Sequence, residues 1–177
     1  MRSYNLLAGS LGLLATQIQF VRSHAVIVDV AGDNGIHGTG FGMVSSVPRD
    51  GTDEQPFQID TAVFKNLIAD PCGSTLAGGS VNVVGSLAAS EKAGKGQLPS
   101  LTDDLVASIT LHQVNGDGGG PFTAMFNTDG TGLKWQNATV VTQAPGENGL
   151  LLGGPFNSLF EAQLPPRTKC NGGANNN

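Results

Sequence analysis

The sequence is poor in cysteine, in aromatic residues and in charge. Two of its 177 residues are cysteine, aromatic residues make up 6% and charged residues make up 13%. Two cysteines at this spacing do not suit a structural zinc site, which takes four ligands. With a single Trp and a single Tyr, the chain has little material for a flat aromatic platform that binds carbohydrate.

Long apolar runs are also missing. No segment reaches the roughly 20 apolar residues that a membrane-spanning helix needs. Residues 1–23 instead predict a secretory signal peptide, because Arg2 precedes a short apolar run from Leu6 to Ala15. We therefore expect a secreted, extracellular protein. Two cleavage sites remain open: a cut after residue 23 makes His24 the first residue, whereas the small-residue pattern "SHA" would leave Val26 first.

Negative charge exceeds positive charge, with 14 Asp and Glu against 9 Lys and Arg. Cleavage after residue 23 removes Arg2 and Arg22 and leaves seven basic residues against the same 14 acidic ones. An acidic surface argues against binding to nucleic acid or to an anionic membrane. We therefore expect a monomer that binds neither nucleic acid nor a membrane.

Glycine, at 26 residues, is abundant, and this predicts many short strands joined by turns. A polar loop is expected over 49–58. The best helix candidate is 60–70, which Asp60 or Thr61 could cap and Pro71 would end. We predict a mainly β fold, an antiparallel β-sandwich of the immunoglobulin or fibronectin type with one short helix and long loops. It would form one domain over 24–170, followed by a disordered tail over 171–177. Strands are expected over 24–32, 38–47, 78–87, 105–115, 121–127, 133–141 and 158–165.

Two covalent modifications follow from an extracellular setting. Cys72 and Cys170 are expected to form one disulfide. It would close a loop of nearly 100 residues and contribute about 4–5 kcal/mol in the chain-entropy account. The sequon "NAT" predicts glycosylation at Asn137, which should then be exposed.

The histidines carry the most specific chemistry. A chain that begins at His24 offers its α-amine and its ring nitrogen to one metal ion, and a second imidazole would complete three nitrogens in a plane. Nitrogen-rich tetragonal sites favour Cu²⁺. His112 is the natural second ligand, since it lies on a well-alternating strand over 105–115. We therefore predict that His24 and His112 are the copper ligands and the catalytic pair.

Other residues are candidates for the surroundings of such a site. Phe122 or Phe126 could take the axial position, and Asp117 could act as an outer carboxylate. Gln113 alternates to the face opposite His112 and is a weaker outer candidate. His37, in a glycine-rich turn, is the reserve ligand if the chain begins at Val26. The simpler interpretation is that these histidines are structural.

Three stretches resemble a known family, the fungal appressorium-associated secreted virulence factors of the Egh, Mas and Gas type. They are "SHAVIVDVAGDNGIHGTGFGM", "PRDGTDEQPFQIDTAVF" and "ASITLHQVNGDGGGPFTAMFNTDGTGLKW". The resemblance covers most of 24–170 and implies an extracellular fungal protein of infection structures. Members of that family continue past the region of Cys170 with further cysteines, whereas this sequence ends at "RTKCNGGANNN", and this departure leaves the cysteine pairing open.

The N-terminal histidine is in addition similar to that of the lytic polysaccharide monooxygenases, whose copper is held by a histidine brace. This likeness implies copper-dependent oxidation of a cell-wall polysaccharide, such as chitin or a plant polymer, by way of His24 and His112. The alternative is a non-catalytic secreted effector or wall-binding protein that contacts carbohydrate or a host protein.

Overall fold

The computed structural model describes residues 25–50, 58–64, 66, 70, 72–154 and 156–172. Its main sheet has five strands in the order β2-β1-β5-β9-β8, and each neighbouring pair is antiparallel. The two longest strands, β5 and β9, lie side by side within it. The strands of this sheet are β1 (Ala25–Ala31), β2 (His37–Gly38), β5 (Val106–Gln113), β8 (Thr139–Thr142) and β9 (Phe156–Gln163).

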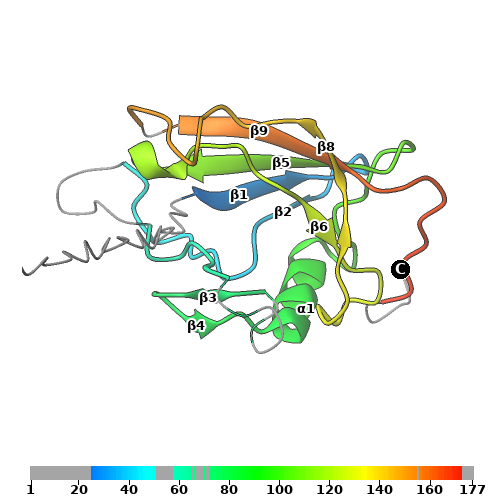
Figure 1. Ribbon diagram of the computed structural model, residues 1–177. Helices are drawn as coiled ribbons and strands as arrows, with labels where there is room; N and C mark the ends of the chain where they lie inside the picture. Colours follow the sequence, from blue (N-terminus) through cyan, green and yellow to red (C-terminus); the bar gives the residue numbers. More distant parts are fainter. Residues whose placement is uncertain are drawn as a thin grey trace, which may run out of the picture.

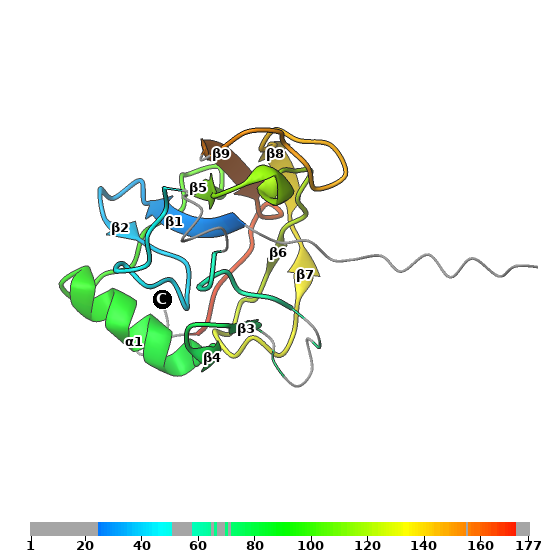
Figure 2. The ribbon, with the colours of Figure 1, turned by 90° about the vertical axis from the view of Figure 1, so that its left-hand side faces the viewer.

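Shorter elements lie across from this sheet (Figure 1). They are the hairpin of β3 (Ser74–Thr75) and β4 (Gly79–Ser80) and the helix α1 (Val83–Ala93). A second hairpin, β6 (Met125–Phe126) with β7 (Gln136–Asn137), stands beside β8 (Figure 2). Over the described residues, the prediction of a mainly β, antiparallel, sandwich-like fold with one α-helix is therefore confirmed.

Strand β5 matches its expected alternation and sets the two faces of the sheet. Facing residues of antiparallel strands share a face, so His112 lies with its partners Val26 and Asn157. Ile109 pairs with Phe160 on the other face. Of the residues of β5, Ser108, Thr110 and His112 lie on the first face, and Ala107, Ile109, Leu111 and Gln113 lie on the second.

The expected helix over 60–70 is wrong for the residues described there. Its N-terminal residue, Asp60, turns its carboxylate to Arg49 and Val44 and does not cap a helix, and Val63 forms a β-bridge with Ser74. The helix is α1 instead, and its first five residues fall in the segment expected to be a strand over 78–87. Asn82 caps it by accepting a hydrogen bond from Gly85 N.

The buried residues of the described part of the chain include as many polar as apolar ones. The apolar ones are Val26, Val47, Val114, Ala144, Phe160 and Ala162, and the polar ones are Gln58, Asp60, Thr61, Thr75, His112 and Gln113. Buried polar groups are costly unless they are hydrogen-bonded. Polar contacts therefore carry much of the specificity of this interior.

The predicted disulfide is not formed, because both Cys72 and Cys170 are free thiols. Different backbone contacts hold the two residues. Cys72 sits in a turn closed by the Gly73 N–H to Asp70 C=O hydrogen bond (3.0 Å), whereas Asn171, next to Cys170, donates to Thr128 O (2.8 Å).

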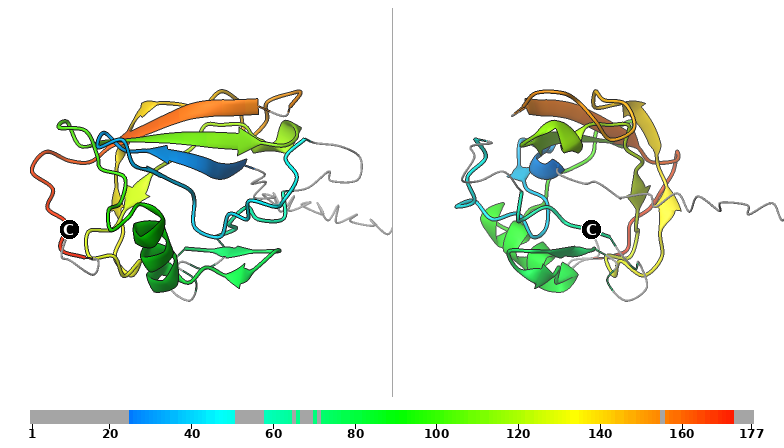
Figure 3. Two further views of the ribbon diagram at one scale, coloured as in Figure 1. Left: turned by 180° about the vertical axis from the view of Figure 1, so that it is seen from behind. Right: turned by 60° about the vertical axis from the view of Figure 1, so that its left-hand side comes forward.

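The chain after β9 runs down one side of the molecule (Figure 3). The tail was expected to be disordered from residue 171. Its first residue is held by the hydrogen bond from Asn171 N–H to Thr128 O. Gly172 packs so closely that a Cβ there would lie 2.2 Å from the carbonyl carbon of Asp129. Residues 173–177 of that predicted tail, like the signal peptide expected over 1–23, lie outside the described residues.

The two thiols should differ in reactivity. Burial raises the pKa of the Cys72 thiol, and the nearby charge of Asp70 raises it further, while Cys170 is exposed. We expect iodoacetamide at mildly alkaline pH to label Cys170 first and Cys72 more slowly, because the thiolate is the reacting form. Peptide mass spectrometry without prior reduction measures both. Two cysteines that become labelled only after reduction would instead establish a disulfide.

No helix among the described residues is both long and apolar enough to cross a membrane.

Candidate functional site

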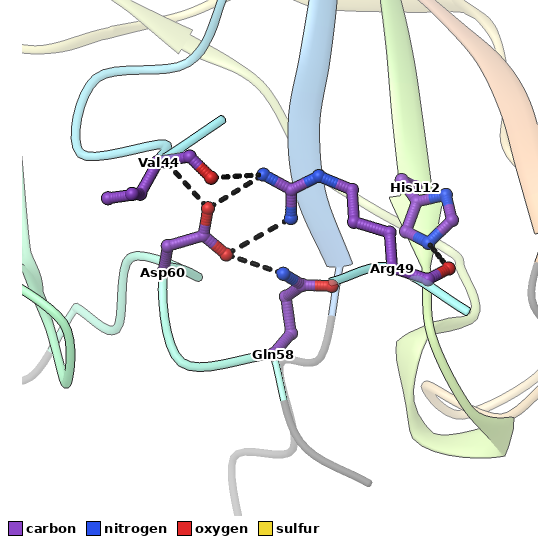
Figure 4. Close-up of polar contacts among 5 residues, drawn as sticks. All are labelled: Val44, Arg49, Gln58, Asp60 and His112. Atoms are coloured by element: carbon purple, nitrogen blue, oxygen red, sulfur yellow. Dashed lines mark hydrogen bonds and ion pairs between the residues drawn. The ribbon is translucent and has the colours of Figure 1, made fainter. Parts of the chain in front are cut away.

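His112 lies near the end of β5 and is buried, with 8% of its surface exposed. Its Nδ1 atom is 2.7 Å from Oδ1 of Asn157 on β9. Its Nε2 atom is 3.1 Å from the carbonyl oxygen of Arg49, which lies on the segment that follows β2 (Figure 4). Both ring nitrogens therefore have a protein partner.

The two partners restrict where hydrogen sits on the ring. A carbonyl oxygen can only accept, so Nε2 of His112 carries hydrogen and donates to Arg49. Oδ1 of Asn157 is likewise an acceptor, so Nδ1 donates to it when the ring carries two hydrogens, whereas a ring with one N–H requires the Asn157 amide to present its nitrogen. In either arrangement Nε2 has no lone pair to offer a metal.

Arg49 connects His112 to a buried carboxylate. Its guanidinium donates to both oxygens of Asp60, from Nη2 to Oδ2 at 2.7 Å and from Nη1 to Oδ1 at 3.2 Å. Asp60 is 1% exposed, and it also accepts from the Val44 backbone N–H (2.7 Å) and from Gln58 Nε2 (2.5 Å). Every acceptor direction of the carboxylate is thus filled by a donor (Figure 4).

The surroundings of Asp60 keep it ionised. Burial alone would raise its pKa, but the hydrogen bonds from Arg49, Val44 and Gln58, together with the charge of Arg49, outweigh burial and lower the pKa below its usual value. The pair is therefore a charged, forked ion pair in the interior, and its geometry is the strong bidentate one.

Two of the other residues predicted around a metal lie on the face opposite His112. Gln113 is buried on the opposite face, as expected from alternation, and donates to Leu151 O at 2.8 Å. The ring of Phe122 meets Phe160 edge to face with centroids 6.1 Å apart, so it also packs on the opposite face. Phe126 belongs to β6, and Asp117 lies in a short 3₁₀ turn, η1 (Gly116–Gly118), after β5.

The remaining histidines differ in position. His37 is exposed, pairs with Asp29 at 2.9 Å, and faces Ala31 on β1. His112 faces Val26 near the other end of β1, so the two histidines are roughly 16 Å apart along that strand. His37 is therefore not placed to share a metal with His112. His24 lies outside the described residues.

The described part of the chain contains no cluster of three or more His, Cys, Asp or Glu side chains that could hold a metal ion. An imidazole nitrogen is a suitable donor for Cu²⁺, but Nε2 of His112 is already used by the Arg49 carbonyl. The residues present fit a copper ion only after this carbonyl has moved away.

The sequence pattern did not identify Arg49, Asp60 or Asn157. Arg49 and Asp60 were placed in a polar loop and at the start of a helix, and Asn157 was outside every candidate motif. One signal was available: Arg49 is the only basic residue between Arg22 and Lys65. A lone arginine amid acidic residues is a candidate for a buried ion pair.

The predicted glycosylation residue, Asn137, is exposed on β7, so its side chain is accessible. Modification of Asn137 stays a prediction.

Comparison with known proteins identifies relatives. The chain is 40% identical over 153 residues to the appressoria-specific virulence factor GAS1 of Pyricularia oryzae, covering 86% of this chain and 61% of GAS1. It is 36% identical over 87 residues to the appressoria-specific virulence factor GAS2 of the same fungus, covering 45% of this chain and 30% of GAS2.

The chain thus spans less than two thirds of the length of these relatives. No solved structure matches it. Its sequence matches the pattern of the Egh16-like virulence factors over residues 22–177. The chain therefore belongs to the Egh16-like virulence factor family.

Proposed function

We propose that this protein is a secreted fungal infection protein that acts at the appressorium. The observation that carries this proposal is the match to the Egh16-like family over residues 22–177, together with 40% identity to an appressoria-specific virulence factor. The signal peptide expected over residues 1–23 supports an extracellular site of action. A fluorescent fusion at the C-terminus tests it: signal at the appressorial surface is expected, and retention inside the cell would contradict it.

The finer part of the proposal is a copper centre formed by the amine and ring of His24 and the ring of His112. Strand pairing supports it, because the first described residue, Ala25, faces Gln113 and Val26 faces His112. Ala25, to which His24 is bonded in the sequence, is one residue along the ladder from the Val26–His112 pair. Copper bound there would supply oxidation chemistry toward a wall polysaccharide such as chitin.

The copper proposal is tested with protein that begins at His24. We expect one Cu²⁺ per chain by calorimetry, with a nitrogen-rich electron paramagnetic resonance spectrum. His112→Ala should weaken binding by more than about 100-fold, beyond what the loss of an outer partner costs. The matched controls are His37→Ala, which should bind as wild type, and a chain that begins at Val26. Equal binding by wild type and His112→Ala would rule the centre out.

A second candidate is a non-catalytic effector or wall-binding protein. It is favoured by the hydrogen bonds that occupy both nitrogens of His112, as expected of a structural histidine. A carbohydrate platform is poorly supported, since Trp135 is only partly exposed and its Nε1 is buried. Oxidised oligosaccharides from chitin with a reductant would favour the copper enzyme, and copper binding without products would favour this second candidate.

A further inference from the structure

We propose that residues 44–49, hereafter the 44–49 loop, form a clamp on Nε2 of His112, and that a metal ion at His112 must displace it. The metal half of this proposal rests on the proposed copper function. The clamp itself rests on contacts among described residues. It assigns to Asp60 a positioning role, through Arg49, for a histidine that it does not touch.

The two nitrogens of His112 differ in how firmly their partners are held. Asn157, at Nδ1, lies on β9 and faces His112 directly in the ladder between β5 and β9. Moving it would disrupt the register of the two longest strands. Arg49, at Nε2, belongs to no strand or helix. Nε2 is therefore the nitrogen that can be released.

The loop is fastened to Asp60 at both of its ends. The Val44 N–H donates to Oδ2, and the Arg49 guanidinium donates to both carboxylate oxygens. Arg49 Nη2 also donates to the Val44 carbonyl at 3.2 Å, which closes the loop on itself. The Arg49 side chain thus fixes its own backbone carbonyl against His112.

The Arg49 carbonyl and a metal ion would compete for the same atom, Nε2 of His112. Metal binding therefore weakens the clamp, and the clamp weakens metal binding. A ligand that binds only the open state shifts the loop outward, and a weaker clamp raises the apparent affinity for that ligand by the same factor. Coupling between such events is typically about 5- to 150-fold. A protein with this clamp would take up metal slowly and would keep His112 protected in its absence.

Amide hydrogen exchange in the unmodified protein tests the clamp without any variant. The Val44 N–H is bonded to a buried carboxylate and should exchange slowly. Addition of Cu²⁺ to the chain that begins at His24 should speed its exchange by about 5- to 150-fold. Unchanged or slower exchange, with Cu²⁺ shown to be bound through His112, would overturn the competition while leaving the copper proposal intact.

Limited trypsin digestion gives an independent measure, since the Arg49–Asp50 bond is cleavable only when the Arg49 side chain leaves Asp60. His112→Phe keeps a ring of similar size but removes the Nε2 donor, and we expect faster cleavage at this bond. His37→Phe is the matched control, since His37 lies on β2 and pairs with Ala31 at the far end of β1, and it should be cleaved as wild type. Equal rates in all three proteins would overturn the clamp.

Arg49→Lys links the two halves of the proposal. It keeps the backbone carbonyl, the charge and a trypsin site but loses the fork on Asp60, so Cu²⁺ affinity should rise. If Cu²⁺ binds neither wild type nor Arg49→Lys, the copper proposal and the competition fail together. The clamp is then still decided by the digestion of His112→Phe.

Discussion

Replacing Asp60 by asparagine is expected to lower the free energy of unfolding by about 3–5 kcal/mol, the usual cost of removing one partner of a buried ion pair. The variant leaves the Arg49 guanidinium without its opposite charge in a site where the Asp60 side chain is fully covered and that of Arg49 is 18% exposed. Urea unfolding followed by circular dichroism measures the loss. A loss below about 1 kcal/mol, typical of a surface salt bridge, would contradict the buried character of the pair.

Asp103→Asn is the matched control, because Asp103 is exposed and its loss should change stability by no more than about 0.5 kcal/mol. The pH dependence supplies a second check. The pKa of Asp60 is lowered in the folded state, so its stabilisation is full above its unfolded pKa of about 3.9 and is lost as pH falls through the lower folded value. The difference between wild type and Asp60→Asn should therefore shrink only below about pH 4.

Gly146→Ala is expected to cost about 3–5 kcal/mol, because backbone strain and overpacking add there. Gly146 has φ +135, a conformation that side chains rarely adopt. A Cβ would also lie 2.4 Å from the nitrogen of Gly120 and 2.8 Å from Cα of Gly119. These are backbone atoms of the glycine run after β5, so they cannot rotate away. The midpoint of thermal unfolding should fall by roughly 6–20 °C.

Gly79→Ala separates the two causes. Gly79 also has a positive φ, +71, but nothing lies within 4 Å of a Cβ placed there. It should therefore cost only about 1–2 kcal/mol, the price of the left-handed conformation alone. Equal losses for the two variants would mean that the contact with Gly119 and Gly120 relaxes without cost.

The sequence predicts a strand correctly where the order of apolar and polar residues reflects which side chains are buried. Strand β5 alternates along its whole length because one face packs on apolar neighbours such as Phe160, and β1 is a nearly continuous apolar run. The helix was misplaced because its signals were local. Asp60 looked like a helix cap, yet its carboxylate is used by Arg49, and long-range contacts override such preferences.

The site was predictable only in its central residue. His112 was singled out by its position on β5, and its alternation correctly placed it opposite the face of Gln113. Its partners come from distant segments, 63 residues away at Arg49 and 45 residues away at Asn157. No periodicity links residues so far apart, and so a pattern within one strand could not find them.

The order of strands in the main sheet has a consequence for synthesis. Strand β5 is bordered by β1, made long before it, and by β9, which begins at Phe156. At translation rates of about 5–20 residues per second, one edge of β5 waits roughly 2–9 s for its partner. An unpaired edge invites pairing with other chains. The nascent protein is therefore most prone to aggregate after β5 has emerged from the ribosome and before β9 has done so.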